Sequence, residues 1–389
     1  MLQEGGILLF VAVSAYIIAS VAIGIRSQAL RTLLLNLIGF LQGVNVKWVT
    51  DPDLAVRVLK SSGDKGDLIE SLLSLPVWKP VISLESVNGE QWRRMKSQFT
   101  KFTQVLQPMS ELTVIFETRG QELLKSKTVI DALKLTELSV ACFYEWIFER
   151  EFDHEKFAVV CQATWEWRKQ LAIKGVADCD VKQRAVEWCV EEIRRTPRLY
   201  VFGEKWAEPE FYSLILQPFV ISPAINLTDV AVVVGEWVKM APAAQSITPE
   251  IIRQCVCSAH PFPVIERYFP EGDTALDIAP NTHVFIPLDE MAGDAFASGV
   301  DLTFGAGPRV CVGRHMAMKA MVGLFTDSLV RSDLFQPRLQ HKYSGRNNDG
   351  KETASETLYQ LMFAIRIVGG AAVDRLRKVY RAYAKGYKP

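Results

Sequence analysis

Apolar residues along this chain recur mostly at three- and four-residue spacing, which places them on one face of a helix. The spacing predicts helices over residues 54–59, 109–124, 129–147, 157–173, 185–193 and 227–240. A second pattern follows the turn residues Pro280 and Asn281, where a short apolar run, 283–286, favours a strand. A further strand-like pair falls within residues 358–368. No repeat or linker divides the body, so we expect one domain that is mainly α with small β-sheets.

The N-terminus shows a different pattern, because residues 6–25 are 20 consecutive uncharged residues rich in Leu, Ile, Val and Ala. Twenty helical residues match the thickness of a bilayer core, so this run predicts a transmembrane helix; a buried core helix is the alternative. A cleaved signal peptide is disfavoured, since Glu4 precedes the run and basic residues follow it. Those basic residues place the body in the cytoplasm. We therefore expect a membrane anchor over residues 1–28, with residues 33–41 lying at the interface or docking on the body.

Charge and cysteine content narrow the classes of function that the sequence allows. Lys plus Arg and Asp plus Glu both number 44 among 389 residues, so the formal net charge is zero and no field of one sign exists to hold a polyanion. Nucleic acid is therefore not an expected partner. The seven cysteines are an odd number without a repeated metal-site spacing, and they are too sparse for a secreted disulfide framework. At 49% hydrophobic residues, the chain can bury a large core in a reducing compartment.

The strongest chemical signal is a short motif before a helix-compatible run that begins at Arg314. Residues 304–313 read Phe-Gly-Ala-Gly-Pro-Arg-Val-Cys-Val-Gly, which fits the pattern Phe-x-x-Gly-x-Arg-x-Cys-x-Gly. The segment resembles the haem-binding loop of the cytochrome P450 haem-thiolate family, here a shortened form of the membrane-anchored eukaryotic type. The resemblance implies a cytochrome P450-like fold after an N-terminal transmembrane helix, and haem b with Cys311 as the axial iron ligand. The alternative is that Cys311 is a small buried hydrophobe beside a glycine-rich loop.

Physical chemistry supports the residue types in this loop. A helix N-terminus aims backbone N–H groups and a positive dipole end at the sulfur, which favours a thiolate. A thiolate donates electron density to iron and favours O–O cleavage. Gly305, Gly307 and Gly313 permit a tight turn and the close approach of backbone to a flat porphyrin. We expect Arg309 to pair with a haem propionate and Phe304 to pack near the ligand and limit water.

Two further segments agree with the family at longer range. Trp92 and Lys96 are four residues apart and share a helix face. They resemble a Trp-x-x-x-Arg pair of the family that contacts the haem propionates, with Lys in place of Arg. The alternative is that this segment is an exposed amphipathic helix with no role in haem binding. The Pro-rich segment 260–267 resembles the exit from the helix before the haem loop, where an arginine again reaches a propionate. Arg267 is the candidate for that role, against the alternative of an ordinary surface arginine.

The helix before the haem loop departs from the family pattern. The resemblance calls for Glu-x-x-Arg, a buried ion pair, but the family spacing places Cys-Val-Cys-Ser there, at residues 255–258. A literal Glu-x-x-Arg occurs at Glu250 and Arg253, five residues early, a shift of roughly 7.5 Å along a helix axis. Thr248 and Pro249 also read as N-cap and first-turn proline, which makes Glu250 a first-turn acid. Capping is the favoured interpretation of the two.

The oxygen-activation segment departs as well. The family places an acid and then a threonine over the iron to deliver protons to bound dioxygen. The nearest catalytic candidates here are Thr228 and Asp229, but Leu227 precedes the threonine and the acid follows it. The interval from Glu290 to Phe304 is also too short for the meander of the family. The alternative for Thr228 is a hydrogen bond back to a carbonyl one helical turn earlier.

Two function classes therefore remain open. The first is a monooxygenase that inserts one oxygen atom from O2 into a lipophilic small molecule, with NADPH supplying electrons indirectly through a flavoprotein reductase. The resemblance then implies a single-pass protein of the endoplasmic reticulum membrane, with a haem-thiolate catalytic domain over residues 29–389 in the cytoplasm. The second is a haem-thiolate isomerase, dehydratase or peroxygenase acting on an oxygenated lipid, or a haem-binding protein whose catalysis has eroded. The family alone favours the first class, and no residue pattern identifies the substrate.

Overall fold

The computed structural model describes residues 28–340, apart from positions 62–63, 67, 69–77, 173–174, 200–204, 206 and 243, together with residues 359 and 362. The predicted transmembrane run, 6–25, lies outside the described residues. Most of the strand-like pair predicted within 358–368 does so too.

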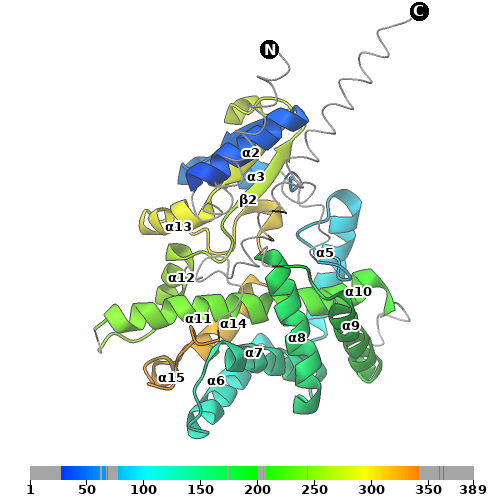
Figure 1. Cartoon of the computed structure of the whole chain (residues 1–389), viewed down its shortest axis with the longest axis vertical. Helices are drawn as coiled ribbons and strands as arrows, with labels where there is room; N and C mark the ends of the chain where they lie inside the picture. Colours follow the sequence, from blue (N-terminus) through cyan, green and yellow to red (C-terminus); the bar gives the residue numbers. More distant parts are fainter. Residues whose placement is uncertain are drawn as a thin grey trace, which may run out of the picture.

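Helices make up most of the described chain (Figure 1). Each helix that the apolar spacing predicts corresponds to an observed one, with ends that differ by a few residues. The α-helices are α2 (Gln28–Gln42), α3 (Pro52–Ser61), α5 (Gly89–Gln104), α6 (Met109–Lys125), α7 (Ala132–Phe148), α8 (His154–Leu171), α9 (Cys179–Arg194), α10 (Pro209–Ile215), α11 (Ser222–Met240), α12 (Pro249–Ser258), α13 (Leu288–Ala297), α14 (Arg314–Leu324) and α15 (Asp327–Val330). Other helical turns are the π-helix η2 (Leu216–Ile221) and the 3-10 turns η3 (Thr274–Leu276) and η4 (Gly307–Arg309).

The strands of the described chain form one three-stranded sheet, which lies with α2, α3 and α13 at one end of the molecule (Figure 1). The central strand is β3 (Thr282–Ile286), which runs parallel to β1 (Asn45–Trp48) and antiparallel to β2 (Ile265–Phe269). Every residue of β3 is buried, as a central strand with an apolar sequence requires. Over the described residues, the prediction of a mainly helical fold with a small β-structure is confirmed.

A buried hydrogen-bond network on β2 orients the neighbouring Arg267. Glu266 is 3% exposed, and its Oε1 accepts a hydrogen bond from His283 Nδ1 at 2.6 Å and another from the backbone N–H of Leu68 at 2.8 Å. His283 also stacks on the ring of Tyr268, with centroids 4.4 Å apart. Because strand side chains alternate between the two faces of a sheet, a fixed Glu266 turns Arg267 toward the opposite face.

The α7 and α11 helices pack against each other at the centre of the helical end of the molecule and are buried along most of their length. Phe219, in the π-turn before α11, contacts Phe99, Phe102 and Phe143 with ring centroids 5.7 to 5.9 Å apart. Among the described residues, one helical stretch, Pro209–Met240, is long and apolar enough to cross a membrane, and 67% of its most apolar window is buried inside the structure. A mostly buried helix of this kind fits the core of the domain.

A buried ion pair joins α8 to α11. Arg168, 3% exposed, donates to the Asp229 carboxylate, to Thr228 Oγ1 at 2.8 Å and to the Ile225 carbonyl at 2.9 Å. Burial lowers the pKa of Arg168, and the Asp229 charge opposes that shift. A guanidinium cannot lose its proton in a protein, so the fold must keep the carboxylate beside it. The pair therefore fixes the rotation of α11 about its own axis.

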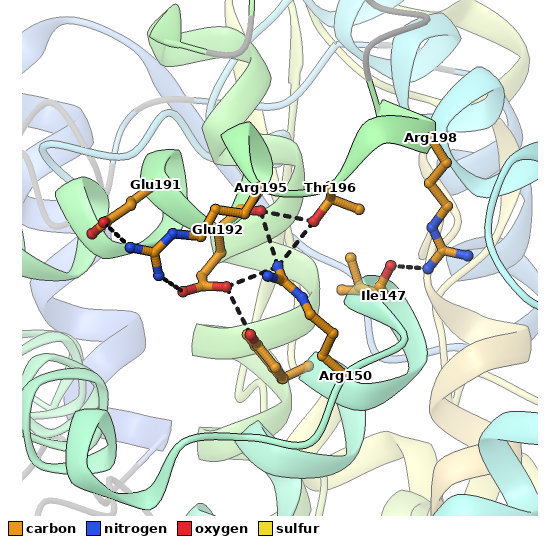
Figure 2. A network of polar contacts seen from close by, with 8 residues as sticks. Ile147, Arg150, Glu191, Glu192, Arg195, Thr196 and Arg198 are labelled. Atoms are coloured by element: carbon orange, nitrogen blue, oxygen red, sulfur yellow. Dashed lines mark hydrogen bonds and ion pairs between the residues drawn. The ribbon is translucent and has the colours of Figure 1, made fainter.

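A second polar network joins the ends of α7 and α9 around Glu192, which is 7% exposed (Figure 2). Arg150 donates to Glu192 Oε2 at 2.9 Å and to Thr196 Oγ1 at 3.1 Å. The Tyr144 hydroxyl donates to the same carboxylate at 2.7 Å. Burial and this carboxylate raise the pKa of Tyr144, so the hydroxyl stays a donor at neutral pH. The network thus links the C-terminal ends of α7 and α9 to each other.

The Glu250–Arg253 pair lies at the surface. Thr248 caps α12, since its side chain accepts a hydrogen bond from the backbone N–H of Ile251 at 3.3 Å. The side chains of Glu250 and Arg253 are 60% and 38% exposed, and Arg253 also contacts Asp301 at 3.2 Å. The favoured interpretation, a first-turn acid after an N-cap, is confirmed. This pair is not the buried ion pair that the family resemblance calls for.

The α2 helix docks on the sheet end of the domain. Leu35 and Ile38 are buried against Phe285 of the central strand. On the outer face, Phe40 is 65% exposed and Leu33 is 44% exposed. Docking, one of the two outcomes expected for residues 33–41, is observed, and it leaves an apolar outer face.

We predict that Arg168→Met lowers the free energy of unfolding by about 3–5 kcal/mol, because it leaves the Asp229 carboxylate without its buried cation. Arg253→Met is the matched control, and its loss should stay under about 1 kcal/mol, as for exposed ion pairs. Urea unfolding followed by circular dichroism measures both. Equal losses for the two variants would contradict a structural role for the buried pair.

Candidate functional site

A cavity of about 280 Å³ lies between α11 and the loop that precedes α14. It brings together seven of the cofactor-binding candidates from three separate parts of the chain. They are Trp92 on α5, Arg267 on β2, and Phe304, Gly305, Arg309, Cys311 and Gly313 on the loop. The opposite wall belongs to α11, through Ser222, Pro223, Asn226, Leu227 and Val230.

The loop is held in a tight turn by its own backbone. The Cys311 N–H donates to the Phe304 carbonyl at 3.0 Å, and Gly305 and Gly307 adopt φ angles of +70° and +72°. A Cβ on Gly307 would lie 2.0 Å from the Leu59 carbonyl oxygen at the end of α3, so only glycine fits there. Gly307 therefore seats the loop on α3, and it does not line the cavity.

The helix that follows the loop is fixed against α6. A Cβ on Gly323 would lie 2.4 Å from the Thr113 carbonyl oxygen, so α14 and α6 approach too closely for any side chain. Thr113 Oγ1 in turn donates to the Lys319 carbonyl at 3.2 Å. This close packing fixes the second half of α14 against α6, and α14 begins three residues after Cys311.

The Cys311 sulfur forms part of the cavity wall. Burial raises the pKa of its thiol to about 11, and the nearby Glu85 charge adds to the rise, while the Gly313 N–H and Arg314 oppose it. Desolvation of the sulfur thus outweighs the opposing contributions of the Gly313 N–H and of Arg314. A thiolate here requires a cation at the sulfur, which is what metal coordination supplies.

Two buried arginines lie at one edge of the cavity. Arg267 is 4% exposed, and the guanidinium of Arg309 lies 4.6 Å over the Trp92 ring. Burial and then the Arg309 charge lower the pKa of Arg267 to about 10, while the charges of Glu85, which also lines the cavity, and of Glu266 oppose the shift. Within the described chain, Arg267 Nε has no hydrogen-bond partner. Two adjacent buried cations form a site for an anionic group.

These residues fit a haem. A haem has a flat apolar ring and two carboxylates at one edge. The cavity offers apolar walls, the Arg267–Arg309 edge for the carboxylates, and a cysteine sulfur for the iron. The observation that carries this fit is that Arg267, Arg309 and the Cys311 sulfur line one cavity whose remaining lining is largely apolar.

Lys96 lies outside the cavity lining. Its ammonium donates to the Pro308 carbonyl at 2.7 Å and lies 4.7 Å over the Trp92 ring. Lys96 thus contacts the backbone of the loop in this structure, and its contact with a propionate stays a prediction. The Trp92 ring lies between this ammonium and the Arg309 guanidinium as a shared contact of both.

Thr228 and Asp229 also lie outside the cavity lining. Both bond to Arg168 of α8, and Thr228 Oγ1 contacts the Ala224 and Ile225 carbonyls at 3.0 and 2.7 Å, the alternative that the sequence left open. A role in proton delivery at the cavity therefore has no geometric support for either residue. The physical reason is the buried Arg168, whose charge must be matched.

The sequence did not single out the residues that hold the Cys311 loop from the side of α12. His260 Nε2 contacts the Thr303 carbonyl at 3.2 Å, and Cys257 Sγ contacts Thr303 Oγ1 at 3.2 Å. Both come from the end of α12 or just after it, where the family resemblance expects an ion pair. Asn226 was missed too, because a lone amide on an apolar helix carries no recognisable pattern. Only its place in the cavity wall distinguishes it.

The fold has known counterparts among solved structures. Neither the models of known protein families nor the curated protein sequences contain a match to this chain. The solved structure of CYP175A1 from Thermus thermophillus is similar with a TM-score of 0.52 and 15% identity, over 74% of this chain and 82% of that one. The cytochrome P450 CYP109Q5 from Chondromyces apiculatus gives 0.54 and 18%, over 73% and 81%. The hydroxylase HmtN gives 0.54 and 15%, over 75% and 87%. Over about three quarters of its length, the chain therefore has the fold of the bacterial cytochrome P450s.

Proposed function

We propose that this protein is a haem-thiolate oxidoreductase that transfers an oxygen atom to a lipophilic small molecule. The observation that carries the proposal is the cavity, which joins the Cys311 sulfur, a buried pair of arginines and an apolar face of α11. The fold similarity to cytochrome P450s supports it.

Each of these groups has a defined task in the proposal. A thiolate-ligated haem supplies an electron-rich iron that favours O–O cleavage. Cys311 provides the thiolate, and Arg267 and Arg309 hold the propionates through charge-assisted hydrogen bonds. Leu227, Val230 and Phe304 keep water from the apolar part of the cavity, which also suits a lipophilic substrate.

The source of the oxygen atom separates two candidate reactions. The monooxygenase reaction takes O2 and NADPH electrons from a flavoprotein reductase, and the name of one structural neighbour, a hydroxylase, supports it. The second candidate uses a substrate or co-substrate that already contains an O–O bond, as a peroxygenase or lipid peroxide isomerase does. The engagement of Thr228 and Asp229 by Arg168 favours this second reaction, because α11 then presents no acid to the cavity.

We also propose that the protein is held at the endoplasmic reticulum membrane, with its catalytic domain in the cytoplasm. The uncharged run 6–25 supports the anchor, and the outer face of α2 supports contact with the interface. Leu33 and Phe40 give that face its exposed apolar character.

The ligand assignment is tested by Cys311→Ala. This variant should lose the long-wavelength thiolate band of the reduced carbon monoxide adduct, because no other cysteine sulfur lines the described cavity. Cys255→Ala is the matched control. Cys255 lies on α12 and is a buried free thiol, but it does not line the cavity. An absorption spectrum of each purified protein decides. A thiolate band that survives in Cys311→Ala would rule out the assignment.

The oxygen source is tested by driving turnover in two ways, with NADPH plus reductase and with cumene hydroperoxide. We expect hydroperoxide-driven product formation per haem to exceed reductase-driven formation by about a hundredfold or more, because a general acid contributes at least about that much. Thr228→Val should leave the ratio and the release of hydrogen peroxide unchanged, because this side chain faces α8. Increased peroxide release in Thr228→Val would instead place the threonine in a proton relay.

The anchor is tested by removing residues 1–28. The shortened chain should leave the membrane fraction and keep its haem, because the cavity residues all lie beyond the deletion. Haem content and sedimentation with membranes after a high-salt wash are the measurements. If the shortened chain still sediments, Leu33→Ser with Phe40→Ser shows whether α2 holds it there.

A further inference from the structure

The α11 wall of the cavity carries a line of neutral polar side chains. The π-turn η2 ends in an i to i+5 hydrogen bond from the Ser222 N–H to the Gln217 carbonyl. The same two residues are joined through their side chains, where Gln217 Nε2 donates to Ser222 Oγ at 3.3 Å. Both residues line the cavity. The π-turn thus aligns Gln217 with Ser222 across the junction of η2 and α11.

Asn226 continues this line one helical turn later. Residues four apart on an α-helix lie one above the other, so Ser222 and Asn226 share the face that lines the cavity. In the part of the chain that the structure describes, the Asn226 amide makes no hydrogen bond. Its neighbours on the cavity wall, Pro223, Leu227 and Val230, offer no side-chain hydrogen bond either.

The other polar groups of the cavity belong to different parts of the chain and have other tasks. The charged residues come from the segment before α5, from β2 and from the haem loop, and they are Lys65, Glu85, Arg267 and Arg309. His260 contacts the Thr303 carbonyl and so holds the loop. Gln217 and Ser222 bond to each other, so Asn226 is the amide of the described cavity wall that has no hydrogen bond within the described chain.

A neutral amide in an apolar wall selects among ligands. It donates and accepts hydrogen bonds but does not titrate, so it matches a ketone or hydroxyl oxygen rather than a proton-transfer step. A hydrocarbon that covers the amide leaves it desolvated and without a hydrogen bond, which costs binding free energy. An oxygen at the right place removes that cost.

We propose that Asn226, extended by Ser222 and Gln217, is the specificity-determining residue of the cavity, and that the substrate is a lipophile already carrying a ketone or hydroxyl oxygen. This inference rests on the proposed function and names the substrate class of the same site. Plain hydrocarbons are the class that it excludes.

The test compares two ligands that differ in one oxygen, the bicyclic ketone 1-tetralone and the hydrocarbon tetralin. Haem content of the full chain is measured first, from its Soret absorbance. Equilibrium dialysis then gives both dissociation constants. Each dissociation constant is corrected for the solubility of the ligand in water. After this correction, the wild-type protein should bind 1-tetralone about tenfold more tightly than tetralin, which is the effect of one buried hydrogen bond. Asn226→Leu should bring the ratio close to one.

Two control variants separate hydrogen bonding from shape. Asn226→Gln keeps an amide and should retain a preference for the ketone, whereas Val230→Leu reduces space on the same wall and should change both affinities alike. A haem-loaded wild type without the preference, or an Asn226→Leu protein that retains it, would overturn the inference. A chain that takes up no haem contradicts the proposed function instead, and the same dialysis still compares the two ligands.

Discussion

The buried ion pair between Arg168 and Asp229 decides what α11 presents to the cavity. A guanidinium that is 3% exposed requires an anion beside it, and Asp229 supplies that anion only when α11 turns this side toward α8. Thr228 also faces α8, since its hydroxyl accepts a hydrogen bond from the same guanidinium. The helix then has Asn226, Leu227 and Val230 left for the cavity wall. Charge balance between two helices thus sets the chemistry of a site that neither Arg168 nor Asp229 lines.

The opposite side of the cavity is governed by a different electrostatic constraint. Arg267 and Arg309 are buried near each other, and their mutual repulsion is a cost that the fold carries. Glu266, fixed by His283, holds β2 so that Arg267 faces the cavity, while the Trp92 ring packs on the Arg309 guanidinium. A dianionic ligand edge would offset the repulsion. The cavity is in this sense electrostatically complementary to haem propionates even though its remaining lining is largely apolar.

Among the residues that the structure describes, the loop that carries Cys311 has no ion pair with both partners buried, since Asp64, 3.8 Å from Arg309, is exposed. Neutral contacts take that place, from Cys257 and His260 to Thr303, and Gly307 seats the loop against α3. Neutral contacts avoid the desolvation that a buried Glu–Arg pair would require. The literal Glu-x-x-Arg at Glu250 and Arg253 belongs to the first turn of α12 and remains exposed. A motif is therefore assigned to a role by its burial, since the letters alone match both roles.

The sequence by itself determined the periodic helices, the strand at 283–286 and the gathering of one motif around Cys311, because these depend on neighbours within one or two helical turns. Arg267 and Trp92 were also found from the sequence, through their resemblance to segments of a known family. Tertiary structure alone decided that Thr228 and Asp229 face α8, that Lys96 contacts the loop, and that Asn226 lines the cavity. Each of these depends on a partner far away in the chain, such as Arg168 for α11 or Pro308 for Lys96. No local pattern specifies which side of a helix such a partner will occupy.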